Sequence, residues 1–189
     1  LDLALEVVAQ NPHDCRANGI VAYVALVMDQ IETALQYAET ALRRARGSLL
    51  FMDGVSYLLT LCGDWERGPA LLQKALKGNP FHSAYVHGAL WVDALRRADY
   101  PTARQAAMVA GASSNFWGPL MRCVALAHLG DMAAATAQNK ELLLFKPKFA
   151  ERGDWLIRRY VKDDAIVAYI RKGLALAGLN VHAPRPDDR

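Results

Sequence analysis

Residues 63–76 read GDWERGPALLQKAL, a short turn followed by a helix that is rich in alanine and leucine. The phrase recurs at residues 28–42 (MDQIETALQYAETAL), 98–110 (ADYPTARQAAMVA) and 130–143 (GDMAAATAQNKELL). The small residues that align in the four copies are Ala34, Gly68, Ala103 and Ala135. They are 34, 35 and 32 residues apart, and self-similarity at this period predicts stacked helical hairpins. Small side chains recur because two helices can cross closely only where little bulk stands between their backbones.

The turns between these helices carry residues that begin and end helices. An aspartate stands directly before the second helix of three hairpins, where its carboxylate can accept hydrogen bonds from free backbone N–H groups. These aspartates are Asp64, Asp99 and Asp131. Gly63 and Gly130 supply the preceding turn at little conformational cost. Pro80 and Pro147 each end a helix and open the next repeat.

The expected fold is all-α: a right-handed solenoid of antiparallel helix hairpins with a C-terminal helical cap. Hairpins are predicted at residues 14–45, 49–78, 82–112 and 115–145, after a helix at 1–10 that belongs to a truncated first repeat. The predicted domains are 1–147 for the repeats, 148–179 for two capping helices and 180–189 for a disordered tail. The capping segment leaves the repeat pattern, and solenoids need such end units to cover an exposed apolar face.

Composition limits the class of protein. The 189 residues are 53% hydrophobic and 22% charged, which is enough apolar mass for a real core. The sequence contains no uncharged apolar run long enough to predict a membrane-spanning helix. Three scattered cysteines predict neither a disulfide framework nor a zinc cluster, so a reducing, cytoplasmic setting fits best. The start lacks an initiator Met, and we expect a piece cut from a longer chain.

Charge is distributed unevenly along the chain. Residues 1–95 hold seven basic against ten acidic residues, and residues 96–189 hold fifteen against nine. The basic segment around Trp155 and Tyr160 mixes cations with aromatic residues, as RNA-binding surfaces do. Helical caps carry the same mixture for solubility. Since the net charge is only +3, we expect neither nucleic acid nor a membrane as partner.

Motifs for catalysis are absent from the sequence. The glycines form no phosphate-binding loop, and no two histidines have the HExxH spacing. His82 and His87 are five residues apart, which would place them on different faces of one helix. The sequence therefore predicts no catalytic residue, no metal site and no cofactor, and the chain is not expected to be an enzyme.

The first helices of the hairpins predict a concave groove with an aromatic and aliphatic lining. The expected lining residues are Arg16, Tyr23, Asp53, Tyr57, Tyr85, Val92, Arg96, Trp117, Met121 and His128. Two interpretations stay open at this point. An apolar groove can accept a hydrophobic peptide or helix, with tyrosine and tryptophan as rigid anchors. Alternatively, neighbouring hairpins or the C-terminal cap fold onto these residues and bury them.

The 34-residue step resembles the tetratricopeptide repeat (TPR), which pairs two antiparallel helices per unit. In chaperone-binding TPR domains a clamp of Lys, Arg and Asn grips a terminal carboxylate, and the groove positions here lack that cluster. Residues 145–179, FKPKFAERGDWLIRRYVKDDAIVAYIRKGLALAGL, resemble the closing stretch of bacterial signalling proteins that join a TPR array to another domain. That domain is a class III adenylate or guanylate cyclase, or a winged-helix DNA-binding domain with a TolB-like middle region.

The resemblance implies a regulatory role and a larger architecture, and it transfers no catalytic residue to this chain. We therefore expect a protein-interaction or regulatory module, the C-terminal arm of a bacterial signalling protein. Its partner would be a protein, a peptide or another domain of the same chain. The competing hypothesis is a scaffold for homo-oligomers that uses the apolar groove.

Overall fold

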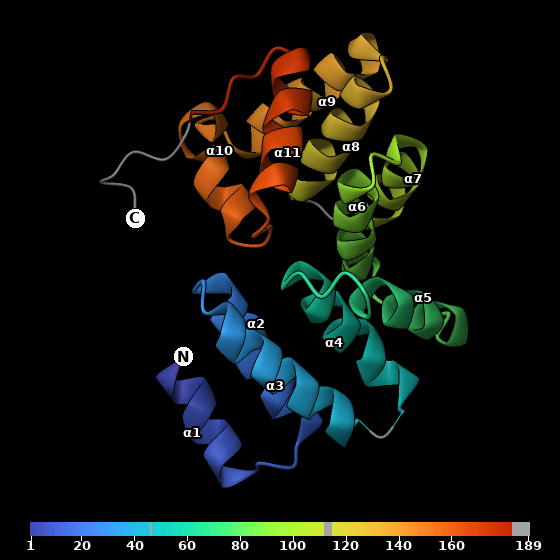
Figure 1. The fold of residues 1–189 in the computed structure, drawn as a ribbon. Helices are drawn as coiled ribbons and strands as arrows, with labels where there is room; N and C mark the ends of the chain where they lie inside the picture. The colour runs from blue at the N-terminus through green and yellow to red at the C-terminus, as the bar shows by residue number, and fades with distance from the viewer. Residues whose placement is uncertain (46, 112–114, 183–189) are drawn as a thin grey trace. The chain divides into compact units, whose positions relative to one another are not determined.

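The computed structural model describes residues 1–45, 47–111 and 115–182, and all regular secondary structure within these ranges is helical (Figure 1). The expectation of an all-α chain is thereby confirmed for the part described. The chain divides into two compact units, Leu1–Ala89 (unit 1) and Leu90–Arg189 (unit 2). The division falls inside helix α6 (His87–Arg96).

Unit 1 consists of short helices that pair in chain order. They are α1 (Asp2–Gln10), α2 (Cys15–Val27), α3 (Ile31–Arg44), α4 (Leu49–Leu61), α5 (Gly68–Gly78), the 3₁₀ turn η1 (Ala84–Val86) and the start of α6. Helices α2 and α3 form one hairpin, and α4 and α5 form the next (Figure 1). Helix α4 packs against both α2 and α3, so the second hairpin leans on the first. This is the hairpin-on-hairpin stacking that the repeat period predicts.

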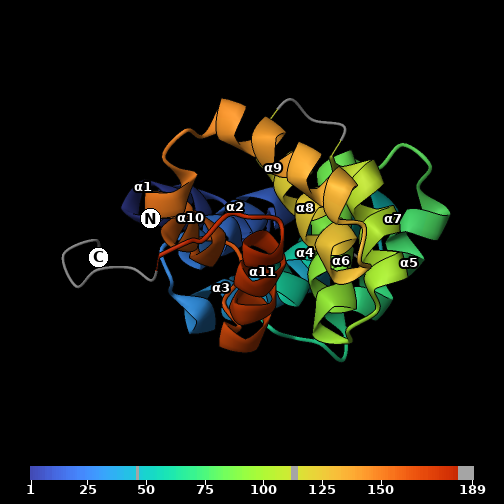
Figure 2. The same ribbon diagram turned by 90° about the horizontal axis from the view of Figure 1, so that it is seen from above.

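Unit 2 is centred on helix α8. Its helices after α6 are α7 (Tyr100–Ala110), α8 (Trp117–His128), α9 (Met132–Phe145), α10 (Phe149–Arg158) and α11 (Asp164–Leu176), all visible in Figure 2. Helix α8 packs against α7, α9 and α11, whereas α10 packs against α11. The last helix of the chain thus lies directly on the first helix of the last hairpin.

Two of the three predicted capping aspartates, Asp99 and Asp131, cap their helices as expected, and Asp64 does not. The carboxylate of Asp99 accepts a hydrogen bond from the backbone N–H of Thr102, and that of Asp131 accepts one from Ala134. Asp64 accepts one from the N–H of Arg67 in the turn before α5, which begins only at Gly68. Asp163 caps α11 by accepting hydrogen bonds from the backbone N–H groups of Ala165 and Ile166. Gly63, Gly130 and Gly178 have φ values of +91°, +86° and +87°, a region that glycine enters without a steric penalty.

The aligned small residues lie where helices cross. Ala34, Ala103 and Ala135 are fully buried, and Gly68 is buried at the start of α5. A Cβ added to Gly68 would lie 2.6 Å from both the backbone N and the Oγ1 of Thr60 in α4. The two backbones are therefore in contact, with no room for even a methyl group.

Three residues of the predicted tail, 180–182, are described by the structure. Leu179 and Val181 are buried, and the backbone N–H of His182 donates to the carbonyl of Ala150 at 3.0 Å. Residues 180–182 therefore pack against unit 2, where apolar burial outweighs the polar character of the local sequence. Residues 183–189 of the predicted tail lie outside the described residues. The predicted boundary at residue 147 does not coincide with the division into units, because α11 shares its packing with α8.

Among the described residues, no helix combines the length and the apolar character that a bilayer span requires.

The close crossing at Gly68 gives a stability prediction with a matched control. Gly68→Ala should lower the free energy of unfolding by about 1–3 kcal/mol, because the new methyl group collides with backbone and forces α5 away from α4. Gly19→Ala, in α2 with no atom within 4 Å of its added Cβ, should raise it by about 0.5–1 kcal/mol through helix propensity. Urea unfolding followed by circular dichroism measures both. Equal effects of the two substitutions would contradict the crossing geometry.

Candidate functional site

The most exposed part of the predicted groove lies in unit 1, where α2, α4 and η1 contribute one aromatic residue each. We call these residues, Tyr23, Tyr57 and Tyr85, together with Arg16, the tyrosine face. Tyr23 and Tyr85 are 41% and 54% exposed, and Tyr57 is half-buried. The rings of Tyr57 and Tyr85 meet edge to face, with centroids 5.2 Å apart. Such an edge-to-face pair holds both rings in fixed orientations.

Two glycines and one buried acid shape the surroundings of these rings. A Cβ at Gly54 would lie 3.6 Å from the Tyr85 hydroxyl, and one at Gly88 would lie 4.0 Å from the Tyr57 ring. The two tyrosine side chains thus lie over glycine backbone, with no side chain between them and the helix. Asp53, predicted to line the groove, is 9% exposed, and its carboxylate accepts a hydrogen bond from the N–H of Gly54 at 2.6 Å. Partial burial, together with the Asp53 charge, raises the pKa of the Tyr85 hydroxyl, which stays a neutral donor at pH 7.

Arg16 brings a cation to α2, two helical turns before Tyr23. Its guanidinium lies over the ring of Phe51 in α4, 5.6 Å from the centroid, and its side chain is 73% exposed. Ile20, one turn further along α2, is 57% exposed. The tyrosine face therefore offers apolar ring surface, phenolic oxygens and an exposed guanidinium, which also lies 4.0 Å from the carboxylate of Asp14. Such a surface can hold apolar side chains and the polar groups beside them.

Of the predicted lining residues on α6, Val92 is buried, whereas Arg96 is exposed and paired with an acid. Val92 is 3% exposed. Arg96 donates to the carboxylate of Asp93 at 2.9 Å, and Arg97 donates to the other oxygen of the same carboxylate at 3.1 Å. Asp93 is itself 4% exposed, so the two arginines compensate a buried charge, a role that constrains their side chains.

On α8, the C-terminal helices cover the predicted groove face. A Cβ at Gly173 of α11 would lie 3.0 Å from Cγ1 and 3.1 Å from Cα of Val124. His128 donates from Nε2 to the carbonyl of Tyr169 at 2.9 Å. Trp117 meets the ring of Tyr160 edge to face at 5.4 Å. Met121, one turn before Val124, is 4% exposed.

The sequence left open whether the predicted groove lining binds a partner or is covered by other parts of the chain. On α8 it is covered, because α11 packs against the face that carries Val124 and His128. Trp117, Met121 and His128 are packing residues in this arrangement. The tyrosine face of unit 1 keeps large aromatic side chains at the surface. Binding at the predicted lining residues stays a prediction, and four of them, Arg16, Tyr23, Tyr57 and Tyr85, belong to the tyrosine face.

The structure also brings together two histidines that the sequence had separated. Nε2 of His82 lies 3.0 Å from Nε2 of His87, and both rings are half-buried. The expectation of opposite helix faces is wrong because α5 ends before Pro80, and the next turn does not begin until Ala84. The bend at residues 79–83 therefore carries His82 back over the start of α6. Burial and the neighbouring His82 lower the pKa of His87, which favours the neutral ring.

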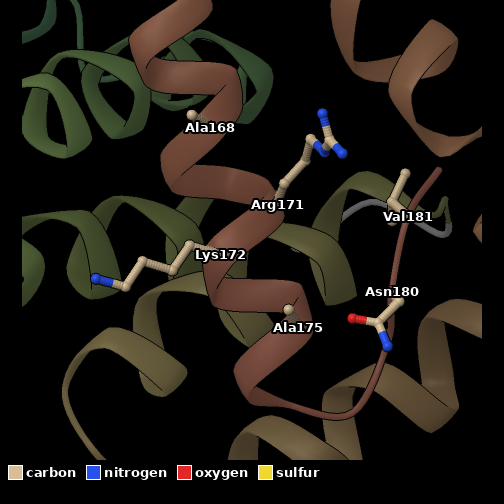
Figure 3. A pocket seen from close by; sticks show the side chains of 6 residues that line it. All are labelled: Ala168, Arg171, Lys172, Ala175, Asn180 and Val181. Atoms are coloured by element: carbon tan, nitrogen blue, oxygen red, sulfur yellow. The ribbon is translucent and has the colours of Figure 1, made fainter. Parts of the chain in front are cut away.

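A shallow hollow of about 300 Å³ on α11 is a weaker candidate (Figure 3). Arg171, Lys172 and Asn180 are its polar lining residues, but Lys172 extends away from Asn180 and Val181 in Figure 3. The guanidinium of Arg171 lies 3.8 Å from the buried carboxylate of Asp154. The hollow thus offers a single cation that already faces an anion.

Two of the three cysteines, Cys62 and Cys123, are buried, whereas Cys15 is half-buried. Burial raises the pKa of the Cys123 thiol to about 12, so it is protonated at neutral pH. Within the described ranges, no cluster of three or more His, Cys, Asp or Glu side chains could hold a metal ion. In the basic C-terminal segment, Arg158 bridges Asp154 and Asp164, and Arg159 lies over the ring of Trp155 at 4.8 Å.

Comparison of the chain with family models, with curated proteins and with solved structures gave no match.

The contact of α11 with α8 gives a second prediction. Gly173→Leu should push α11 off α8, because the added side chain would enter the backbone and side chain of Val124. Hydrogen exchange measured by mass spectrometry should show faster exchange at the amides of α8, while α2 in unit 1 exchanges as before. Ala165→Leu, at an exposed position of the same helix, should leave α8 protected. Unchanged protection of α8 in Gly173→Leu would overturn the assignment of α11 as its cover.

Proposed function

We propose that this chain is a non-catalytic protein-interaction module and that the tyrosine face of unit 1 is where a partner segment binds. The single observation that carries the proposal is the presentation of Tyr23, Tyr57 and Tyr85 by α2, α4 and η1, with at least part of each ring at the surface. Tyrosine gives a large contact area at a low cost in conformational entropy, and it is enriched where binding energy concentrates. Because packed hairpins hold the rings in place, little ordering cost is incurred on binding.

The chemistry of the face indicates the kind of partner. Ring surface and Ile20 favour an apolar side chain, and the phenolic hydroxyls favour a polypeptide with groups left to hydrogen-bond. Arg16 at the rim favours an acidic residue beside the apolar one. The preferred ligand is thus a short apolar segment of a protein with an acidic flank.

The repeat period and the hairpins of unit 1 support the TPR-like interpretation of the whole chain, in which the hairpins form a right-handed superhelix. Under this interpretation the chain is a regulatory arm of a larger signalling protein, and the segment bound by the tyrosine face belongs to another protein or to another domain of the same chain. A membrane is not part of the proposal. The setting that fits it is the cytoplasm, where the free cysteines stay reduced.

Site-specific photocrosslinking tests the proposal. A photoreactive phenylalanine analogue replaces Tyr23 or Tyr85 in the cells that produce the protein, and the same analogue at Leu144 serves as the control. Leu144, on α9, is 83% exposed. Adducts to one discrete polypeptide are expected from positions 23 and 85 and not from 144. The same pattern from all three positions would contradict a defined face.

Affinity measurements with the purified crosslinked polypeptide complete the test. Tyr23→Ala and Tyr85→Ala should each weaken binding about tenfold or more, equivalent to about 1.4 kcal/mol, whereas Leu144→Ala leaves it unchanged. Binding that survives both tyrosine substitutions would overturn the proposal.

The second candidate is a homo-oligomerisation scaffold, favoured by the exposed apolar residues Leu3 and Val7 on α1 as well as by Ile20. Its signature in the same experiment is an adduct between two copies of this chain. Sedimentation velocity over a concentration series would then show a dimer that Tyr23→Ala dissociates. A monomer at every concentration excludes this candidate without affecting the first.

A further inference from the structure

The turn that joins α5 to α6 is built around Asn79. The side-chain oxygen of Asn79 accepts a hydrogen bond from the N–H of Phe81 at 3.1 Å, and its carbonyl lies 3.4 Å from the backbone N of His82. This local bonding fixes the backbone between Pro80 and Ser83. As a result, His82 is held over the first residue of α6, which is His87.

The hydrogen bonds of His82 settle which of its nitrogens carries the proton. Nδ1 lies 2.9 Å from the carbonyl oxygen of Asn79. A carbonyl oxygen can only accept, so Nδ1 is the protonated donor and Nε2 of the neutral ring keeps its lone pair. Metal-binding histidines have this arrangement, in which the distal ring nitrogen donates to a carbonyl and orients the ligating nitrogen. The lone pair of His82 points to Nε2 of His87, 3.0 Å away.

We propose that Nε2 of His82 and Nε2 of His87 form a two-histidine site for a divalent transition-metal ion of the Cu²⁺ or Ni²⁺ type. With metal–nitrogen bonds of about 2.0–2.1 Å, two nitrogens 3.0 Å apart subtend an angle of about 95° at the metal. That is the angle between adjacent ligands in the tetragonal geometry that Cu²⁺ and Ni²⁺ prefer. Tetrahedral Zn²⁺ would require the nitrogens to separate to about 3.3 Å. Water occupies the other coordination positions.

Without metal, a hydrogen bond from Nε2 of His87 to Nε2 of His82 spans the same distance. When the metal binds, the proton leaves Nε2 of His87 and the ring takes up a proton at Nδ1 from water, so the ring stays neutral. The two Nε2 lone pairs then bind the metal. Small rotations of the two rings turn both lone pairs toward a common point.

Isothermal titration of the untagged chain with CuCl₂ and, separately, NiCl₂ tests the proposal. One saturable site per chain is expected. His82→Gln and His87→Gln should each weaken binding about tenfold or more, because a single imidazole remains. His13→Gln, an exposed histidine of the same unit, is the matched control and should bind as the unsubstituted chain does. Circular dichroism checks that each variant keeps its helices.

Electron paramagnetic resonance of the Cu²⁺-loaded chain gives an independent readout. Hyperfine splitting from two imidazole nitrogens is expected in the unsubstituted chain and from one in either variant. If no saturable site is found, the two histidines form only a hydrogen bond and the proposal is overturned. Equal metal affinity in the unsubstituted chain and all the variants would also overturn it. Both results are independent of the partner proposed for the tyrosine face, because neither Tyr23 nor Tyr85 is changed.

Discussion

Close approach of helix backbones is the constraint on which both units depend. At Gly68 the first turn of α5 touches the backbone of Thr60, and an added Cβ would come within 2.6 Å of its nitrogen. In unit 2, Gly111 and Gly118 face each other so closely that a Cβ on Gly118 would lie 2.9 Å from the carbonyl oxygen of Gly111. Since dispersion attraction falls steeply with distance, such crossings fix how deeply larger residues such as Leu72 and Leu120, both fully buried, interdigitate.

Close approach of helix backbones also explains why the predicted groove face is covered on α8 in unit 2 and partly exposed in unit 1. On α8, a glycine of α11 lies directly against Val124, so the chain supplies its own cover for that face. In unit 1, Gly54 and Gly88 lie beneath tyrosine rings instead of beneath another helix. The rings of Tyr57 and Tyr85 fill the space that the glycines leave, and part of each ring stays at the surface.

Some of the basic residues in the C-terminal half form ion pairs with buried carboxylates. Asp154 is 1% exposed, and its two oxygens face Arg158 at 2.8 Å and Arg171 at 3.8 Å. Removing one partner of such a pair would leave an uncompensated charge in a low-dielectric interior, so the pair specifies how α10 lies on α11. The excess of basic residues after residue 95 therefore serves internal packing as well as the surface, which a count of charges cannot reveal.

Local physics made much of the fold predictable from the sequence. The hairpins predicted at 14–45, 49–78 and 115–145 agree with the observed helix pairs, because capping aspartates, glycines with positive φ and alanines at crossings act over a few residues. Helices α6 and α7 lie within the remaining predicted range, 82–112. The period likewise assigned Tyr23 and Tyr85 to the predicted groove lining, but it left open whether that lining is exposed or covered.

The choice of packing partner lay beyond the sequence. That α11 covers α8, that Val181 is buried and that His82 meets His87 all depend on contacts set by the shape of the assembled helices. The two histidines are close because of a bend at residues 79–83, and a helical count of five residues assumes no bend. The sequence alone thus determined where helices begin, end and cross. Only the tertiary structure decided which faces are covered, because burial depends on the fit between segments far apart in the chain.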